Sequence, residues 1–219
     1  VACSTDNFAI RPDKFINVSA KDDGWETSGT TKTLANSAVT GGNVHKAGRP
    51  FTLSATAVNA AAVTTSNYTG RPSATIACTL PTPTCTNGAL TTTVWDGFGT
   101  TISNDAKYSE VGSFNLTLTD SEFANVDIND SSVAEYTISS DPVSVGRFVP
   151  DHFSLTVDTV PMFQTFNATC TDTRSFTYIG QPFKYKTPPV IAIAAKNADD
   201  GTTSNYRDAL WTLTESGVD

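Results

Sequence analysis

The stretch Phe51-Thr-Leu-Ser-Ala-Thr-Ala-Val58 places an apolar side chain at every second position. Phe51, Leu53, Ala55 and Ala57 fall on one face, and threonine and serine fall on the other. This period is typical of a β-strand with one face on a hydrophobic core and the other toward water. The stretch therefore predicts one strand of a half-buried sheet.

The same period recurs along the chain between clusters of turn-forming residues. Residues 113–119 alternate through Phe114, Leu116 and Leu118. Further strands are predicted at 15–20, 75–80, 89–95, 134–138, 143–148 and 153–157. About seven short strands in roughly 140 residues, without a helical period of useful length, favour a β-sandwich. We predict an all-β protein built of immunoglobulin-like β-sandwich modules.

Three blocks of the sequence occur twice in the same order. They are Phe8-Ala-Ile-Arg-Pro-Asp-Lys-Phe15 with Arg147-Phe-Val-Pro-Asp-His-Phe153, Gly48-Arg-Pro-Phe51 with Gly180-Gln-Pro-Phe183, and Thr64-Thr-Ser-Asn-Tyr68 with Thr202-Thr-Ser-Asn-Tyr206. Pro12 and Pro150 are 138 positions apart, as are Tyr68 and Tyr206. Such spacing predicts tandem copies of one module. We expect a first module at 1–147 and the N-terminal half of a second, incomplete one at 148–219, with a stiff junction at 141–146.

Composition excludes several classes of protein. Charged residues make up 16% and hydrophobic residues 38% of the chain, which is the reverse of the balance in disordered proteins. A net charge of −8 without a lysine or arginine run argues against nucleic acid as a partner. The longest mostly apolar stretch, 188–195, is too short to span a bilayer. A start at Val1 is interpreted as a processed or excised piece of a longer chain.

The cysteines point to an oxidising compartment. Cys78 and Cys85 bracket a short turn-rich loop, and we interpret them as a disulfide that would stabilise the fold by about 2–3 kcal/mol. The alternative, two free thiols, would suit a cytosolic protein. The spacing lacks the nearby ligands of a zinc site. For Cys3 and Cys170 we favour partners outside this sequence.

Catalytic motifs are missing from the sequence. It contains no nucleophile elbow, no phosphate-binding glycine loop and no His-Glu-x-x-His helix. His45 is expected in a polar loop, and Lys14 stands in the first copy where His152 stands in the second. We therefore expect a protein that is not an enzyme and has no cofactor.

Two further features suggest binding. The acidic stretch 120–131 offers oxygen ligands that suit calcium, although a solvated surface loop is the favoured explanation. The candidate ligands are Asp120, Glu122, Asn125, Asp127, Asn129 and Asp130. Trp95 and Trp211 lie among alternating residues and are predicted in the core, whereas Trp25 lies in a polar turn. An exposed Trp25 could stack on a sugar or another ligand.

Five blocks of the sequence resemble a known family. They are Cys3-Ser-Thr-Asp-Asn-Phe-Ala-Ile-Arg-Pro12, Ala47-Gly-Arg-Pro-Phe-Thr-Leu-Ser-Ala-Thr-Ala-Val58, Tyr108-Ser-Glu-Val-Gly-Ser-Phe114, Gly146-Arg-Phe-Val-Pro-Asp-His-Phe153 and Phe176-Thr-Tyr-Ile-Gly-Gln-Pro-Phe183. These are similar to the C-terminal region of the MSHA pilus biogenesis (MshQ-like) family of large secreted proteins of Gram-negative bacteria. The second block, followed by Asn67-Tyr-Thr-Gly70, also resembles bacterial immunoglobulin-like repeats of surface adhesins. The resemblance implies an extracellular or cell-surface location and supplies no catalytic or binding residues.

Together these observations predict a non-enzymatic stalk module of a surface protein associated with type IV pili or adhesion. Its partners would be other modules of the same long chain, and pilus or filament subunits or surface glycans. One alternative is a carbohydrate- or receptor-binding module that makes the adhesive contact itself. The other is a filament component that polymerises by strand exchange, because an incomplete sandwich leaves strand edges unpaired.

Overall fold

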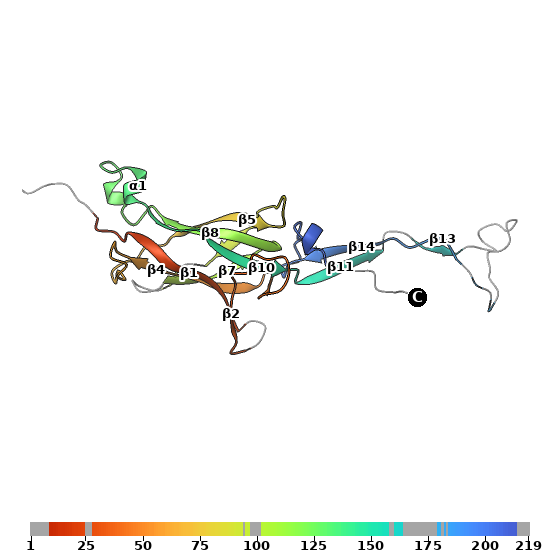
Figure 1. The fold of residues 1–219 in the computed structure, drawn as a ribbon. Coiled ribbons are helices and arrows are strands. Elements are labelled where there is room, and N and C mark those ends of the chain that lie inside the picture. The colour runs from red at the N-terminus through yellow and green to blue at the C-terminus, as the bar shows by residue number, and fades with distance from the viewer. Residues whose placement is uncertain are drawn as a thin grey trace, which may run out of the picture. The chain divides into compact units, whose positions relative to one another are not determined.

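The computed structural model describes residues 9–24, 28–93, 95–96, 102–157, 160–163, 179–180, 182 and 184–213. The chain divides into two compact units. The first comprises Val1–His152 and Lys196–Asp219, and the second comprises Phe153–Ala195. The first unit holds a ten-stranded sheet that folds over on itself (Figure 1). Its strands are β1 (Lys14–Asp23), β2 (Thr31–Thr33), β3 (His45–Lys46), β4 (Pro50–Val58), β5 (Ser73–Leu80), β6 (Leu90–Thr92), β7 (Ile102–Tyr108), β8 (Gly112–Asp120), β9 (Ile138–Ser140) and β10 (Val143–Val149).

The strands lie in two layers. Their order is β3-β10-β8-β9-β1-β4-β7-β6, with β2 beside β1 and β5 beside β8. In Figure 1, β5 and β8 lie over β1, β4 and β7. The short strand β9 pairs antiparallel with β8 and parallel with β1, so it joins the two layers. The prediction of an all-β protein is confirmed.

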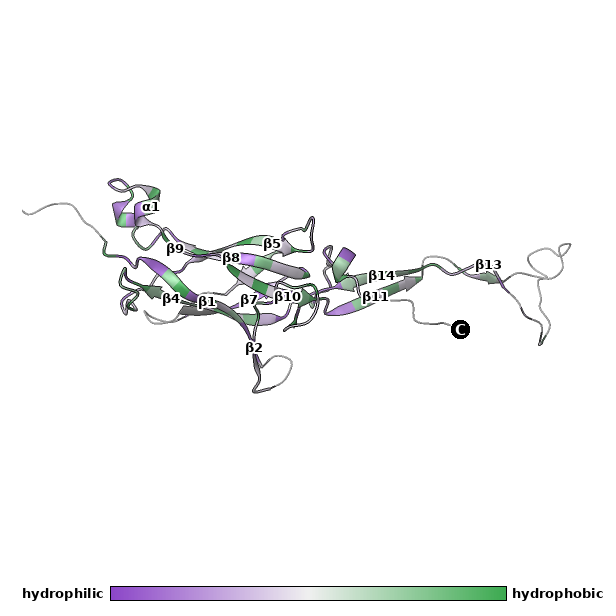
Figure 2. Ribbon diagram, viewed as in Figure 1, coloured by the Kyte–Doolittle hydropathy of each residue, from purple (hydrophilic) through white to green (hydrophobic). Residues whose placement is uncertain are grey.

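The alternation along β4 has its expected result. Phe51, Leu53, Ala55 and Ala57 are all buried, while the threonines and serine between them are partly exposed. β4 pairs antiparallel with β1 on one side and with β7 on the other. Figure 2 shows the change between hydrophilic and hydrophobic residues along the strands. The apolar face of β4 therefore forms one wall of the core.

The opposite wall comes from β8 and β10. Phe114, Leu116 and Leu118 of β8 are fully buried. The rings of Tyr108 and Phe114 have centroids 4.5 Å apart, and those of Phe51 and Phe148 are 5.4 Å apart. These ring pairs connect the two layers and stabilise the core beyond the burial of apolar area.

Gly112 allows β8 to begin close to the end of β5. Its φ is 106°, and a Cβ at this position would clash with the carbonyl oxygen of Leu80. Only glycine adopts this conformation without strain.

Two strand predictions need correction. Residues 134–138 were expected as a strand, but Val133–Tyr136 form the helix α1, and β9 begins only at Ile138. Ser132 and Glu135 make a capping box there, in which the Ser132 backbone N–H donates to Glu135 Oε2 at 2.7 Å. Such a box favours a helical turn over an extended chain. The strand expected at 89–95 shortens to β6.

The second unit contains two short strand pairs. β11 (His152–Val157) pairs with β14 (Ile191–Lys196), and β12 (Met162–Phe163) pairs with β13 (Tyr185–Thr187). The remaining described helices are the 3-10 turns η1 (Asn125–Asp127) and η3 (Asp208–Leu210). No helix in the described residues has the length and apolar character to span a membrane.

The two copies share their strand register. The backbone N–H of Asp13 donates to Val58 O at 2.7 Å, and 138 positions later the N–H of Asp151 donates to Lys196 O at 2.8 Å. The pairs β1–β4 and β11–β14 are therefore equivalent at this point. The expected boundary between residues 147 and 148 falls inside β10, and the division into modules stays a prediction.

The loop that follows each pair is also equivalent. Asn59 N–H donates to Val63 O at 2.9 Å, and Asn197 N–H donates to Gly201 O at the same distance. Residue 62 has a φ of 58° and residue 200 a φ of 61°. Residues 59–63 and 197–201, which precede the repeated block, therefore form the same turn in both copies.

The first copy of this loop ends on a buried tyrosine. Tyr68 is almost wholly buried, and its hydroxyl donates to Asp120 Oδ2 at 2.5 Å. Its ring lies 5.6 Å from that of Phe15 and 5.0 Å from that of Phe123. Burial raises the pKa of Tyr68 well above its ordinary value, and the hydrogen bond to Asp120 raises it further.

We expect alkali to destabilise the protein through Tyr68. In the unfolded chain this group loses its proton near pH 10, whereas the folded state retains it. The stabilisation is therefore complete below pH about 10 and is lost as the pH rises above that value. Tyr68→Phe should reduce the fall of the unfolding free energy by up to ~1.4 kcal/mol per pH unit above pH about 10.

Urea titrations at several pH values check this expectation. Phe123→Leu is the control, because it disturbs the packing around Tyr68 but removes no titratable group. It should lower stability and leave the alkaline slope unchanged. Equal slopes for Tyr68→Phe and the wild type would contradict the assignment.

Candidate functional site

A loop of the second copy, residues 197–206, packs on one end of the first-copy sandwich. We call this end the rim and define it as residues 47–49, 84–88 and 109–111. The rim and the loop both belong to the first compact unit. The segment continues into η3, and the Arg207 side chain donates to Thr84 O at 2.8 Å.

Glu110 is the centre of this contact. Its side chain is buried, with the residue 6% exposed. Oε2 accepts hydrogen bonds from the backbone N–H and the hydroxyl of Ser204, both at 2.8 Å. Oε1 accepts from the N–H of Asn205 at 3.1 Å and from that of Val111 at 2.8 Å. A buried carboxylate is tolerated only with such donors, and charge-assisted hydrogen bonds are the stronger kind.

Asn205 binds the backbone of the rim through its side chain. Its Oδ1 accepts from Thr86 N–H at 3.0 Å, and its Nδ2 donates to Thr86 O at 2.8 Å and to Val111 O at 3.2 Å. The residue has no exposed surface. A carboxylate, which accepts but cannot donate, would not satisfy the two carbonyl groups.

The start of the loop makes two more contacts. Asn197 Nδ2 donates to Ser109 O, and the N–H of Ala198 donates to Ala47 O, both at 2.9 Å. Gly48 makes the second contact sterically feasible, because a Cβ there would lie 2.7 Å from Ala198 N. The glycine of the Gly48-Arg-Pro-Phe51 block is therefore needed for close approach of the second copy.

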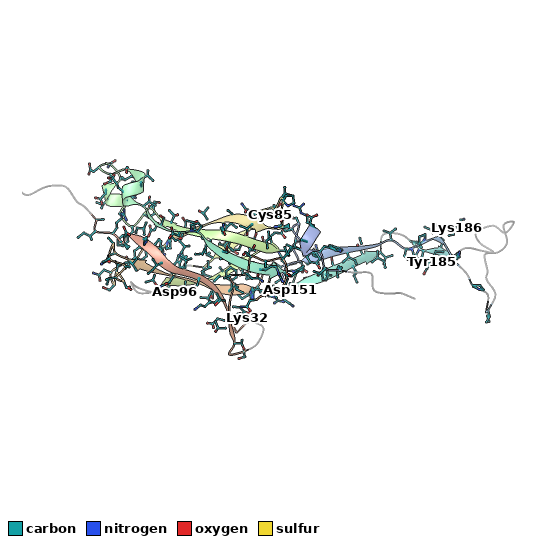
Figure 3. All side chains as sticks on the ribbon, viewed as in Figure 1. Lys32, Cys85, Asp96, Asp151, Tyr185 and Lys186 are labelled. Carbon is teal, nitrogen blue, oxygen red and sulfur yellow. A yellow bond between two sulfur atoms is a disulfide. The ribbon has the colours of Figure 1, made fainter. Side chains whose placement is uncertain are left out.

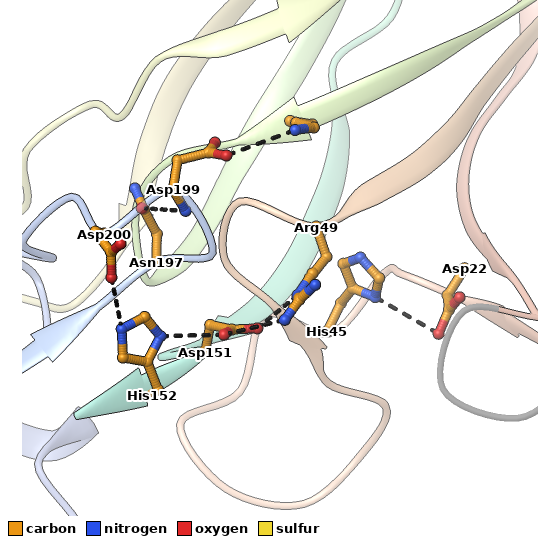
Figure 4. A network of polar contacts seen from close by, with 9 residues as sticks. Asp22, His45, Arg49, Asp151, His152, Asn197, Asp199 and Asp200 are labelled. Carbon is orange, nitrogen blue, oxygen red and sulfur yellow. Dashed lines mark hydrogen bonds and ion pairs between the residues drawn. The ribbon is translucent and has the colours of Figure 1, made fainter. Parts of the chain in front are cut away.

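A chain of charged side chains lies beside these hydrogen bonds (Figure 4). Arg49 donates to both carboxylate oxygens of Asp151, at 2.6 and 3.2 Å. His152 Nδ1 lies 3.1 Å from Asp151 Oδ2, and its Nε2 lies 2.9 Å from Asp200 Oδ1. The hydrogen bond from Arg49 is the main reason that the pKa of Asp151 lies below its usual value.

The polar side chains of this arrangement bond to groups of the chain itself. Both ring nitrogens of His152 lie at hydrogen-bond distance from a carboxylate, and both oxygens of Glu110 accept protein donors. Glu110, Asn205 and Asn197 hold the loop on the rim.

The predicted disulfide is present beside the rim. Cys78 and Cys85 are bonded with their Cα atoms 6.0 Å apart, and Cys85 is labelled beyond the end of β5 in Figure 3. The Cys78 N–H donates to Asn87 Oδ1 at 2.7 Å. The bond therefore closes the loop that carries Thr84, and Thr86 follows directly after Cys85. Cys3 and Cys170 lie outside the described residues.

The calcium candidates have other roles in the structure. Asp120 is buried, with Oδ2 bound to Tyr68 and Oδ1 accepting the N–H groups of Glu122 and Phe123 at 2.9 and 3.0 Å. Asp127 Oδ2 accepts the N–H of Ala9 at 3.0 Å. Asn125, Asn129 and Asp130 are exposed. Among the described residues no group of three or more His, Cys, Asp or Glu side chains could hold a metal, and calcium binding stays a hypothesis.

The tryptophan predictions have mixed outcomes. Trp25, the candidate for ligand stacking, lies outside the described residues. Trp95 packs against the core and donates its indole N–H to Pro72 O at 2.7 Å. The core prediction for Trp211 is wrong, since it is 47% exposed. Its ring rests on Tyr206 at 5.2 Å, in a segment without strand structure.

The prediction for His45 is also wrong. It was expected in a polar loop but is fully buried, with its ring 6.1 Å from that of Phe51 and 5.9 Å from that of Phe148. β3 pairs in parallel with β10, and this pairing carries His45 into the core. Its Nδ1 lies 3.5 Å from Asp22 Oδ2.

Residues 110–218 match the model of a domain described as DUF6701, third domain. No curated protein and no solved structure matches the chain. The matched region starts at Glu110 and includes loop 197–206, so it contains both sides of the central contact. It also crosses the boundary expected at residue 147.

Sequence reasoning did not assign Glu110 or Asn205 to a site. A signal was present, because the repeated Thr-Thr-Ser-Asn-Tyr block contains Ser204 and Asn205. No such signal marks Glu110, because its role depends on contacts with Ser204 and Asn205, which lie 94 and 95 positions away in the sequence.

We expect Glu110→Gln to release the loop from the rim. A glutamine turns an NH2 group toward donors that need an acceptor, and each unsatisfied buried group costs about 1–3 kcal/mol. Hydrogen exchange should then show faster exchange of the Ser204 and Asn205 amides. Glu122→Gln, an exposed change elsewhere, is the control. Unchanged protection of both amides in Glu110→Gln would show that the carboxylate does not hold the loop.

Proposed function

We propose that this chain is a non-enzymatic stalk region of a secreted or cell-surface protein, built from immunoglobulin-like sandwich modules. The observation that carries the proposal is the polar contact between the two copies. A loop of the second copy is held on the rim of the first by Glu110, Asn205 and Asn197. Successive copies attached through specific hydrogen bonds suit a protein that holds another part at a distance.

Two other features support an extracellular setting. The disulfide between Cys78 and Cys85 is of a kind that persists in oxidising compartments. The two-layer, all-β architecture of the first unit fits the sandwich modules common in surface proteins. The resemblance to the MshQ-like family extends the proposal to type IV pili and adhesion, with pilus subunits or surface glycans as partners.

Immunogold electron microscopy of producing cells tests the location. Antibodies raised against residues 1–147 should label the outer surface or its filaments, and cells that lack the gene serve as the control. Label on filaments would support the association with pili, and label spread over the cell body would support a general surface stalk. Label confined to the cytoplasm would contradict the proposal.

A second candidate function is a filament component that accepts a β-strand from another molecule. It is favoured by an exposed apolar face on the β11–β14 pair. Ile191 and Ile193 are exposed there, whereas their equivalents Leu53 and Ala55 are buried in the first copy. In that copy, strands of the opposite layer cover this face, so a partner strand with alternating apolar residues would suit it.

Sedimentation over a range of concentrations tests this candidate. The chain should self-associate as its concentration rises, and Ile193→Lys should suppress the association by placing a charge on the exposed face. Asn129→Lys, an exposed change on the acidic stretch of the first unit, is the control. A chain that stays monomeric at every concentration would exclude strand exchange between copies.

A further inference from the structure

The first copy carries its own version of the docked loop, and there it is exposed. Residues 64–68 have the same sequence as residues 202–206, and the two loops share their backbone hydrogen bonds. We propose that loop 59–67 is a docking surface for the rim of another module of this type. The contact would repeat the one that loop 197–206 makes on the first copy.

Asn59 and Asn197, the first residues of the two loops, make equivalent side-chain hydrogen bonds within their loops. Asn59 Oδ1 accepts the N–H groups of residues 61 and 63, both at 3.0 Å. Asn197 Oδ1 accepts those of residues 199 and 201, at 3.0 and 2.8 Å. Each side chain is thereby held with its Nδ2 free to reach outward. Asn197 donates this group to Ser109 O, whereas Asn59 is exposed and uses its Nδ2 for no hydrogen bond within the described chain.

The two central contact residues also have exposed counterparts. The Ser204 hydroxyl donates to Glu110, and the Asn205 side chain donates to the carbonyl groups of Thr86 and Val111. Ser66 and Asn67 hold the equivalent positions, are exposed, and bond to no side chain or backbone group that the structure describes. The same residues in the same loop conformation present the same donors and acceptor.

The surroundings of loop 59–67 can admit a partner. The loop lines a groove of about 470 Å³ together with Ile10, Arg11, Pro12 and Phe123. Asp13 is exposed beside it and is the equivalent of Asp151, which binds Arg49. The partner chemistry follows directly from the first copy. It is a sandwich rim with a glutamate at the position of Glu110 and an arginine at the position of Arg49.

Such a contact joins one end of a module to the opposite end of the next. Contacts of this heterologous kind repeat from module to module without closing. The inference deepens the proposed stalk function and rests on it in one respect, namely that modules of this type occur in series.

The test makes the rim available in the full chain. Asn205→Asp places a second carboxylate beside Glu110 and should release loop 197–206, which exchange of the Ser204 amide verifies. The released rim can then accept loop 59–67 of another molecule. In sedimentation this variant should assemble with rising concentration beyond the wild type, whose rim is covered. Adding Asn67→Asp should weaken the assembly by about tenfold or more, because the carboxylate cannot donate to the rim carbonyls.

Asn129→Asp, a change of the same kind on the exposed acidic stretch, is the matched control and should leave assembly intact. If the Ser204 amide stays protected in Asn205→Asp, Ser204→Pro removes the N–H that binds Glu110 and opens the rim instead. A released rim without added assembly, or assembly that survives Asn67→Asp, would overturn the inference. Neither result bears on the cellular location, so immunogold label at the cell surface would leave the stalk proposal standing.

Discussion

The face-to-face packing of β4 against β8 is the constraint on which the first unit depends. Each strand has one apolar face. If either face were exposed to water, the fold would lose the favourable free energy of burying side chains such as Phe51, Leu53 and Phe114. The two layers therefore lie together, and the short strand β9 joins their edges. The loops at one end of the layers then form the rim, since their positions follow from the strands that they connect.

The rim shows how buried polar groups are accommodated. Glu110 accepts four hydrogen bonds, and the Asn205 side chain satisfies the backbone N–H and C=O of Thr86, which lies in the loop between β5 and β6. Removing a partner from a buried charge costs more than an exposed ion pair contributes. The central hydrogen bonds therefore carry more weight in this contact than the pair of Arg49 with Asp151, in which the Arg49 side chain is 33% exposed. Because the contact depends mainly on hydrogen bonds to one carboxylate and one amide, a pattern of charged residues in the sequence does not indicate the site.

The repeat is the feature that links fold and proposed function. A loop that is exposed in one copy and docked on the rim in the other shows both states of the same local structure in one chain. Its backbone is alike in both, so the loop does not need to change conformation in order to dock. A preorganised surface loses little conformational entropy on binding, which favours attachment through a small number of hydrogen bonds.

Much of the local structure was determined by the sequence alone. Period-2 alternation predicted β4 and β8 because burial of one face requires it. It also predicted the strand β11, but the burial expected for one face of that strand is wrong, since its apolar residues are exposed. The spacing of Cys78 and Cys85 sufficed for a disulfide across a short loop. Only the tertiary structure decided that His45 is buried, that Trp211 is exposed, and that Glu110 and Asn205 meet in a buried contact. These depend on which strand pairs with β10 and on which loop reaches the rim. Contacts between residues about a hundred positions apart leave no local periodicity, so the repeat marks Ser204 and Asn205 but does not report their contact with Glu110.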